Sequence, residues 1–262
     1  MVGFVTNGNH TLRYHVCALS TDQPNALTNC TDARSGDMPI PGEGITGVAH
    51  ETMMVDESVR AVSQAFAIRM KGQTSRVVVR NLAIDRVGEH LLFKEVCEIK
   101  FGSEDSEDYT FVSQVLIQNN LLLVLQPYFK TIRVFQLGDP GCLPIHNITA
   151  TTLKTGYFSP QGMRVWGEGG VLLVWQWDEL LALKVSGHSA SDFKVRLISS
   201  NPLPFVDLYT ILTDAAPYLL VLGYKASQVV KYHLDHKYKL TRLGVIGLDG
   251  STLVPPSQGS YA

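Results

Sequence analysis

The sequence predicts an all-β protein built of repeated four-stranded antiparallel sheets, and three observations lead to this prediction. Apolar runs that pass through a polar or aromatic tip and return as alternating runs recur along the chain. Three of these runs begin at Leu121, Val171 and Leu219, so they are spaced by 50 and 48 residues. Weaker strand-like runs flank the hairpins, which brings the number of strands in a unit to four.

Five hairpins are predicted, over residues 2–16, 65–82, 121–137, 171–185 and 218–234. The first contains Asn7-Gly8, a pair that tolerates the positive φ angles of a type I′ turn. The third is the clearest, because LLLVLQ and TIRVFQL flank the tip PYFK. Its first run is apolar on both faces, as expected of an inner strand that is covered on both sides.

Outer strands with alternating polar residues are expected after four hairpins, over residues 91–101, 145–153, 193–199 and 239–246. First strands are expected before three hairpins, over residues 112–115, 162–166 and 208–212. One such meander cannot bury both of its faces, whereas meanders packed face to face around an axis can. The predicted fold class is therefore a β-propeller, complete or partial, with about five recognisable four-stranded blades.

The chain is expected to form a single β-propeller domain over residues 1–262. An irregular loop insertion is expected at about residues 22–63, where Pro and Gly are frequent. Residues 56–70 could form a helix, since Val59 and Val62 would share one helical face. A strand from Phe66 onward is favoured, because the repeat places one there.

Charge and hydropathy exclude two classes of partner. The net charge is −2 and Lys and Arg do not cluster, which argues against nucleic acid, because phosphate contacts need clustered cations. No run approaches the roughly 18 apolar residues of a membrane span. The N-terminus lacks a basic segment followed by an apolar one, so no signal peptide is predicted.

The cysteines and glycosylation sequons bear on the cellular compartment. The four cysteines form no C-x-x-C pair, so metal-ribbon and thioredoxin-like sites are excluded: Cys17, Cys30, Cys97 and Cys142. Three sequons begin at Asn9, Asn29 and Asn147, and with an even number of cysteines they would suit a secreted domain. Without a signal peptide, an intracellular protein, cytoplasmic or nuclear, is favoured.

The blade-like runs, especially LLLVLQPYFKTIRVFQL, resemble those of WD40-like β-propellers over most of the chain. The dipeptides of that family stand elsewhere, since Trp177-Asp178 falls at a hairpin tip and Gly187-His188 follows a third strand. The resemblance is thus to a degenerate WD40-like propeller. TIRVFQL is also similar to propellers of F-box-linked and de-etiolated-type ubiquitin-ligase receptors, which implies a substrate-receptor part of a larger complex.

No catalytic residue, cofactor or metal site is predicted. Asp178 and Glu179 are adjacent at a tip, which favours a solvated turn over a pair of catalytic carboxylates. His233 and His236 lie three apart, so in a strand they point to opposite faces instead of toward one metal ion. The sequence contains no phosphate-binding loop or dinucleotide fingerprint.

The hairpin tips are the candidate binding surface, because aromatic and basic residues together are typical of interface hot spots. The predicted partner-binding residues are Tyr128, Phe129, Lys130, Trp177, Tyr224 and Lys225. In the alternative interpretation, Tyr128 and Phe129 fold back onto the blade. Trp166 and Trp175 are expected in the core.

These features predict a non-catalytic scaffold or adaptor that binds protein partners through loop tips on one face of the propeller and needs no cofactor. The alternative is a secreted or cell-surface propeller, either a binding ectodomain or a glycoside-type hydrolase. A disulfide between any two of the four cysteines would favour this alternative, because disulfides persist in oxidising compartments.

Overall fold

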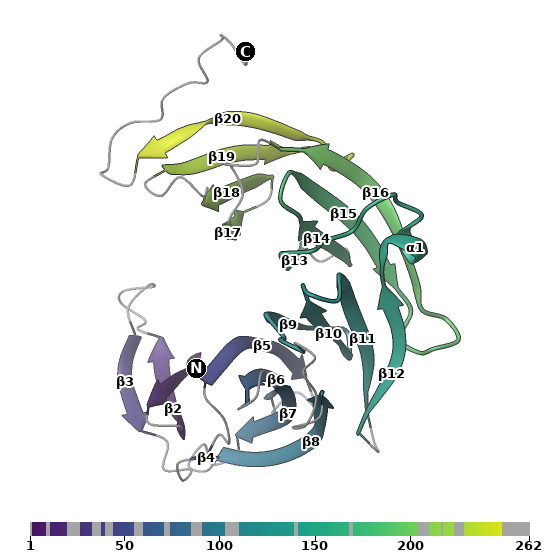
Figure 1. The fold of residues 1–262 in the computed structure, drawn as a ribbon. Coiled ribbons are helices and arrows are strands. Elements are labelled where there is room, and N and C mark those ends of the chain that lie inside the picture. Colours follow the sequence, from purple (N-terminus) through teal and green to yellow (C-terminus); the bar gives the residue numbers. More distant parts are fainter. Residues whose placement is uncertain are drawn as a thin grey trace. The chain divides into compact units, whose positions relative to one another are not determined.

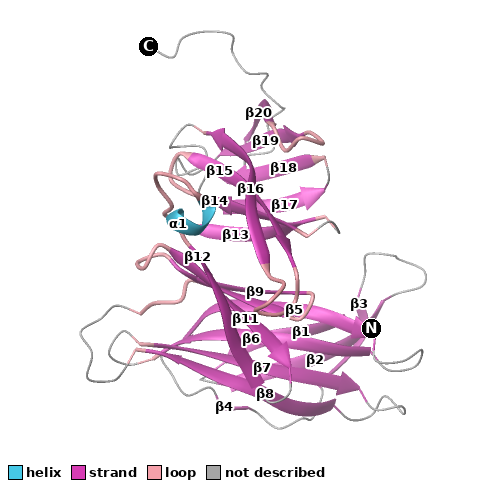
Figure 2. Cartoon of the chain, turned by 90° about the vertical axis from the view of Figure 1, so that its right-hand side faces the viewer, coloured by secondary structure: helices cyan, strands magenta, loops and turns pink. Residues whose placement is uncertain are grey.

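The computed structural model describes residues 2–8, 11–19, 27–32, 38–39, 44–54, 60–70, 74–84, 91–102, 110–138, 141–167, 170–203, 210–215, 217–222 and 228–247. In several of these segments only the backbone is described, including all of those before residue 44. The described residues form twenty strands and one short helix (Figures 1 and 2). The strands are arranged in five four-stranded sheets, which confirms the all-β class and the four-stranded unit.

The first sheet contains β1 (Val2–Gly8), β2 (Thr11–Leu19), β3 (Leu27–Asp32) and β4 (Met38–Pro39). The second sheet contains β5 (Gly44–Met54), β6 (Arg60–Arg69), β7 (Ser75–Ile84) and β8 (Leu91–Phe101). In the first sheet, β3 and β4 both pair with β2. In the second sheet, all four strands pair antiparallel in chain order.

The third sheet contains β9 (Gln114–Gln118), β10 (Leu121–Gln126), β11 (Thr131–Gly138) and β12 (Gly141–Ile148), and the helix α1 (Ala150–Leu153) follows it. The fourth sheet contains β13 (Gly162–Trp166), β14 (Val171–Trp175), β15 (Glu179–Ser186) and β16 (Lys194–Pro202). The fifth sheet contains β17 (Thr210–Ala215), β18 (Tyr218–Leu222), β19 (Gln228–Leu234) and β20 (Leu240–Gly247). In these three sheets the strands are neighbours in chain order, as in the second sheet.

Two expectations for the N-terminal third differ from the structure. The stretch 22–63, expected to be an irregular loop, contains β3, β4, β5 and the start of β6. Asn7-Gly8 is not a turn, because Gly8 pairs with Thr11 and thus lies within the ladder of the first hairpin. Of the two alternatives for residues 56–70, the favoured strand from Phe66 onward is confirmed, since residues 60–69 belong to β6.

The chain divides into two compact units, and the single β-propeller domain over residues 1–262 stays a prediction. Unit 1 comprises Met1–Val124 and Phe135–Leu143, and unit 2 comprises Leu125–Val134 and Pro144–Ala262. Each unit has its own hydrophobic core. In unit 1, side chains from the second and third sheets pack around Val79 and Leu122. In unit 2, side chains from the last two sheets pack around Leu173 and Val221.

The second strands of the sheets form the centres of these cores. All six residues of β10 and all five of β14 are buried, so both faces of each strand are covered. This explains why LLLVLQ and VLLVW carry apolar residues without alternation. At the edge of β14, the Trp175 ring lies over Gly162, its partner in β13.

A disulfide joins the outer strands of two sheets in unit 1. It links Cys97 in β8 to Cys142 in β12, with the two Cα atoms 5.8 Å apart. These residues are 45 positions apart in the sequence. The other two cysteines, Cys17 and Cys30, lie on the neighbouring strands β2 and β3.

Candidate functional site

The tip between β10 and β11 presents two aromatic rings. Residues 127–130 form a turn that is closed by a hydrogen bond from the Lys130 N–H to the Pro127 carbonyl (3.0 Å), with Lys130 at φ 51°. Tyr128 is 66% exposed and Phe129 is 41% exposed. Their rings meet edge to face with centroids 5.6 Å apart. Both rings are therefore displayed, and the alternative in which they fold back onto the blade is wrong.

The connection from β12 to β13 brings a third ring to this tip. It starts with α1, whose Thr149 and Thr152 form a reciprocal capping box that fixes the direction of the chain. The connection then presents Tyr157, which is 49% exposed. The Lys130 ammonium lies 6.0 Å from the centroid of the Tyr157 ring, at the outer limit of a cation–π contact.

The turn between β14 and β15 holds the fourth ring. Gln176 is fully buried and organises this turn: its side-chain oxygen accepts from the Ser159 N–H, and its amide group donates to a Glu179 carboxylate oxygen at 2.8 Å. Trp177 follows Gln176 and is 37% exposed. Since Ser159 lies two residues after Tyr157, these bonds tie the β12–β13 connection to this turn.

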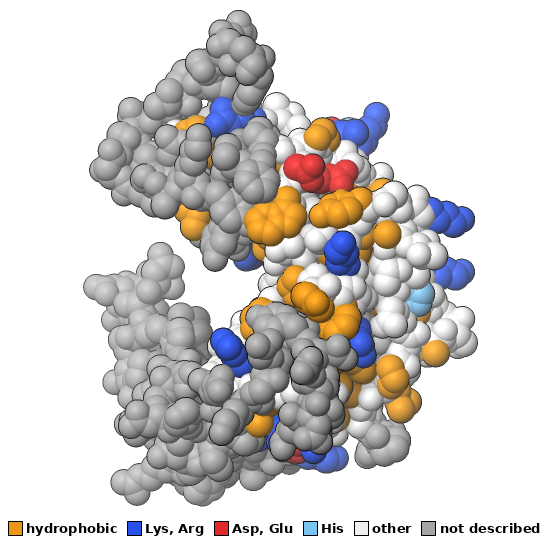
Figure 3. All heavy atoms as spheres, viewed as in Figure 1, with side chains coloured by type: hydrophobic (Ala, Val, Ile, Leu, Met, Phe, Trp, Pro, Cys, Tyr) orange, Lys and Arg blue, Asp and Glu red, His pale blue; other side chains and the backbone are white. Residues whose placement is uncertain are grey.

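We call Tyr128, Phe129, Lys130, Tyr157 and Trp177 the aromatic surface. All five residues belong to unit 2 and lie on three segments that the contacts above join together. On the face drawn in Figure 3, hydrophobic side chains gather over β13 to β15 beside a group of acidic ones. The geometry suits the binding of another molecule through exposed rings, with the Lys130 cation beside that of Tyr157.

The sequence identified most of this surface. The predicted residues Tyr128, Phe129, Lys130 and Trp177 are exposed, and Trp166 and Trp175 are buried as expected. The other two predicted residues, Tyr224 and Lys225, lie outside the described residues. Tyr157 was missed, because it lies between repeats where the strand pattern gives no information. Its signal was an aromatic residue in a turn-rich stretch, TGYFSP.

Two acidic residues in the segments considered for catalysis or metal binding accept hydrogen bonds from within the chain. Glu179 accepts hydrogen bonds from Gln176 and from the Ser200 hydroxyl. Asp235, between the two histidines, accepts from the N–H groups of Lys237 and Lys239 at 2.8 and 2.9 Å. Among the residues that the structure describes, no group of three or more His, Cys, Asp or Glu could hold a metal ion.

Two exposed carboxyl groups are stabilised in their ionised form by turns. A hydrogen bond from the Ser189 hydroxyl, followed by one from the Ser189 N–H, holds the pKa of Asp192 below its usual value. The pKa of Asp235 is lowered chiefly by the hydrogen bond from the Lys239 N–H. Both groups accept hydrogen bonds within loops between strands, so their negative charges stabilise these turns.

The described part of the chain contains no helix long and apolar enough to cross a bilayer. No protein-family model matches the sequence, and no curated protein matches it significantly.

Solved structures do match the fold. A protein from Lactobacillus plantarum shares 11% identity at a TM-score of 0.56, over 97% of this chain and 66% of that one. A protein from Bacteroides uniformis, provisionally assigned as a 6-phosphogluconolactonase, shares 12% identity at a TM-score of 0.52, over 94% of this chain and 71% of that one. This chain thus spans about two thirds of the length of these proteins.

The class defined by these likenesses and by the five sheets is that of an all-β, propeller-like protein. At such low identity the likeness shows the fold alone. The number of blades and the closure of a ring stay predictions, as does the resemblance to WD40-like and F-box-linked propellers.

Proposed function

We propose that this chain is a non-catalytic interaction module that binds a protein partner through the aromatic surface of unit 2. The observation that carries the proposal is the display of Tyr128, Phe129, Tyr157 and Trp177, each between 37 and 66% exposed, on three joined segments. Large aromatic side chains are usually buried, and exposed groups of them mark interaction sites. Rings with two rotatable bonds also lose little entropy on binding.

The charges around the rings indicate the chemistry of the partner. Lys130 lies beside the Tyr157 ring, while the exposed Asp178 follows Trp177. A partner with an apolar centre, one acidic group opposite Lys130 and polar groups at the rim would match this surface. The proposal agrees with the role of scaffold or adaptor, whether or not the protein is part of a ubiquitin ligase.

We expect the double substitution Tyr128→Ala/Phe129→Ala to weaken partner binding by about 30-fold, since loss of a hot spot costs about 2 kcal/mol. The measurement is affinity capture of the full chain with quantitative mass spectrometry, followed by a binding titration with each captured partner. The stability of the variant should stay close to that of the wild type, because both side chains are exposed.

Tyr218→Ala is the matched control. Tyr218 is also an exposed aromatic residue, at 40%, and contacts Lys231 and His233 outside the aromatic surface. The Tyr218→Ala variant should capture the same partners as the wild type. Partners that bind equally well to the wild type and the double variant would show that the aromatic surface is not the interface.

A second candidate, a secreted or cell-surface binding ectodomain, is favoured by the disulfide between Cys97 and Cys142. Asn147, which starts a sequon, is exposed in β12 and open to glycosylation. If this candidate is correct, protein isolated from its native cells should resist thiol alkylation at Cys97 and Cys142 and carry a glycan on Asn147. Reduced thiols and an unmodified Asn147 would contradict this candidate and favour an intracellular interaction module.

A further inference from the structure

A row of polar side chains crosses the second sheet in unit 1. Glu51, Ser63, Asn81 and Lys94 are direct partners across β5, β6, β7 and β8. Direct partners in an antiparallel ladder point to the same face, with strands about 4.8 Å apart. The row is fixed by its own bonds, because Ser63, only 4% exposed, donates to the Asn81 side-chain oxygen at 2.7 Å.

The acidic end of this row is used within the protein. The two carboxylate oxygens of Glu51 accept from the N–H groups of Asn119 and Asn120, at 2.6 and 3.4 Å, in the turn between β9 and β10. Both turn residues have positive φ angles. These bonds hold the turn against the second sheet and engage both carboxylate oxygens of Glu51.

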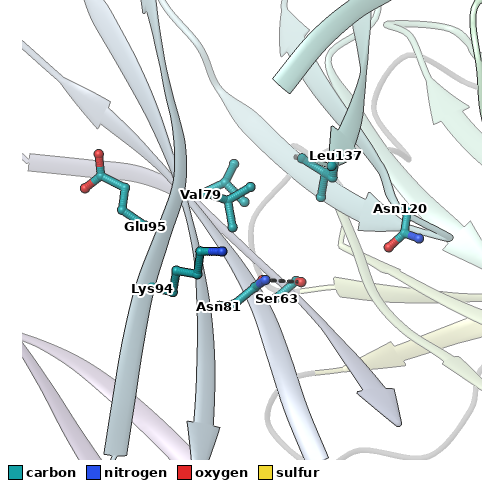
Figure 4. Close-up of a pocket in the computed structure, with 9 residues that line it drawn as sticks. Ser63, Val79, Asn81, Lys94, Glu95, Asn120 and Leu137 are labelled. Carbon is teal, nitrogen blue, oxygen red and sulfur yellow. Dashed lines mark hydrogen bonds between the residues drawn. The ribbon is translucent and has the colours of Figure 1, made fainter. Parts of the chain in front are cut away.

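The other end of the row opens into a cavity of about 270 Å³. Ser63, Asn81 and Lys94 line one part of it. Val79 and Leu137 supply an apolar wall, and Asn120 lies on the far side. Figure 4 shows the Lys94 side chain directed toward Val79 and Asn81, with Leu137 and Asn120 across the space. All of these residues belong to unit 1.

The charge in the cavity is that of Lys94. Glu95 is the single acidic residue among those that line it, and its carboxylate points away in Figure 4. That carboxylate pairs with Arg80 on the opposite face of the sheet, with nitrogen and oxygen 3.7 Å apart. Because the Asn81 side-chain oxygen already accepts from Ser63, the NH₂ group of Asn81 is left to donate beside the Lys94 ammonium.

We propose that this cavity binds a small organic monocarboxylate. The Lys94 ammonium and the Asn81 NH₂ group would hold the carboxylate, and Val79 and Leu137 would cover its apolar body. A phosphate group, with more charge, is usually met by several cations or backbone N–H groups, whereas the cavity offers one cation. The volume lies just below the range that accepts drug-sized ligands, so the molecule is smaller than these. This site is independent of the aromatic surface.

The test uses butyrate and its uncharged isostere butyramide, followed through the backbone amide signals of the full chain by NMR. We expect butyrate to bind with a dissociation constant on the order of 1 mM and to shift the signals of Asn81, Lys94 and Asn120. Butyramide should bind at least about tenfold more weakly, since hydrogen bonds to charged groups are the stronger ones.

Lys94→Met keeps the apolar stem and removes the charge, so it should weaken butyrate binding by at least about tenfold. Lys100→Met is the matched control, because Lys100 is an exposed lysine of the same strand that does not line the cavity. It should leave binding unchanged. Both side chains are exposed, and the dispersion of the amide signals reports that each variant is folded.

Three results would overturn the proposal. The first is a lack of shifts at these amides with up to about 50 mM butyrate. The second is equal binding of butyrate and butyramide, and the third is unchanged binding to the folded Lys94→Met variant. The proposal would also be overturned by a peptide with a free C-terminal carboxylate that binds here much more tightly than butyrate and than its own amidated form. The ligand would then be the C-terminus of a polypeptide instead of a small molecule.

Discussion

Replacing Cys97 and Cys142 together by serine is expected to lower the free energy of unfolding by about 4 kcal/mol under oxidising conditions, as estimated from loop-closure entropy. The disulfide closes a loop of 45 positions and thereby restricts the unfolded chain. It also fastens the outer strands β8 and β12, which have neighbours on one side only. The measurement is urea unfolding of wild type and variant, with and without reductant.

The reductant separates this bond from the other cysteines. Reduced wild-type protein should fall to about the stability of the reduced double variant, and any difference between the oxidised and the reduced double variant would report on Cys17 and Cys30. Equal stability of oxidised wild type and the double variant, with free thiols at both positions, would show that the bond does not form.

The second large effect is expected at Gly162, where alanine should cost about 3 kcal/mol of stability. A Cβ atom at Gly162 would lie 2.0 Å from the Trp175 ring, which is 5% exposed and therefore has little room to move. Either the ring leaves its place in β14 or the ladder between β13 and β14 opens. Urea unfolding measures the loss of stability, and near-ultraviolet circular dichroism reports whether the Trp175 ring has moved.

Gly156→Ala is the control for this substitution, because nothing lies within 4 Å of a Cβ atom at Gly156. It should change the stability by less than about 0.5 kcal/mol. Trp175→Leu in the Gly162→Ala background should recover part of the loss, since the smaller side chain vacates the space. A Gly162→Ala variant as stable as the wild type would contradict the packing of Trp175 over this position.

The sequence was most informative where a strand is buried on both faces. LLLVLQ and TIRVFQL predicted β10 and β11 to within one residue, because an uninterrupted apolar run has few alternatives to an inner strand. The prediction was wrong at residues 22–63, where Pro and Gly suggested a loop. There β4 is a two-residue strand containing Pro39, which pairs with Thr11 in β2. Such pairing depends on a distant strand and leaves no local pattern.

The aromatic surface and the polar row differ in the same way in how far the sequence predicts them. Tyr128, Phe129 and Trp177 could be predicted because they stand at hairpin tips that the repeat locates. The row from Glu51 to Lys94 could not, since its four members are scattered over 44 positions of the sequence. They become neighbours only through the registers of three ladders, two of which contain a bulge that shifts the register.

The turns under the aromatic surface have a consequence for how this protein can diverge. The turn at residues 127–130 is closed by main-chain atoms, and the main-chain N–H of Gln176 likewise donates to the Glu179 carbonyl at 2.8 Å. Exchange of the side chains of Tyr128, Phe129 or Trp177 removes none of these bonds. New recognition properties can therefore evolve at these positions at little cost in stability, while Gly162, Trp175 and Gln176 stay constrained.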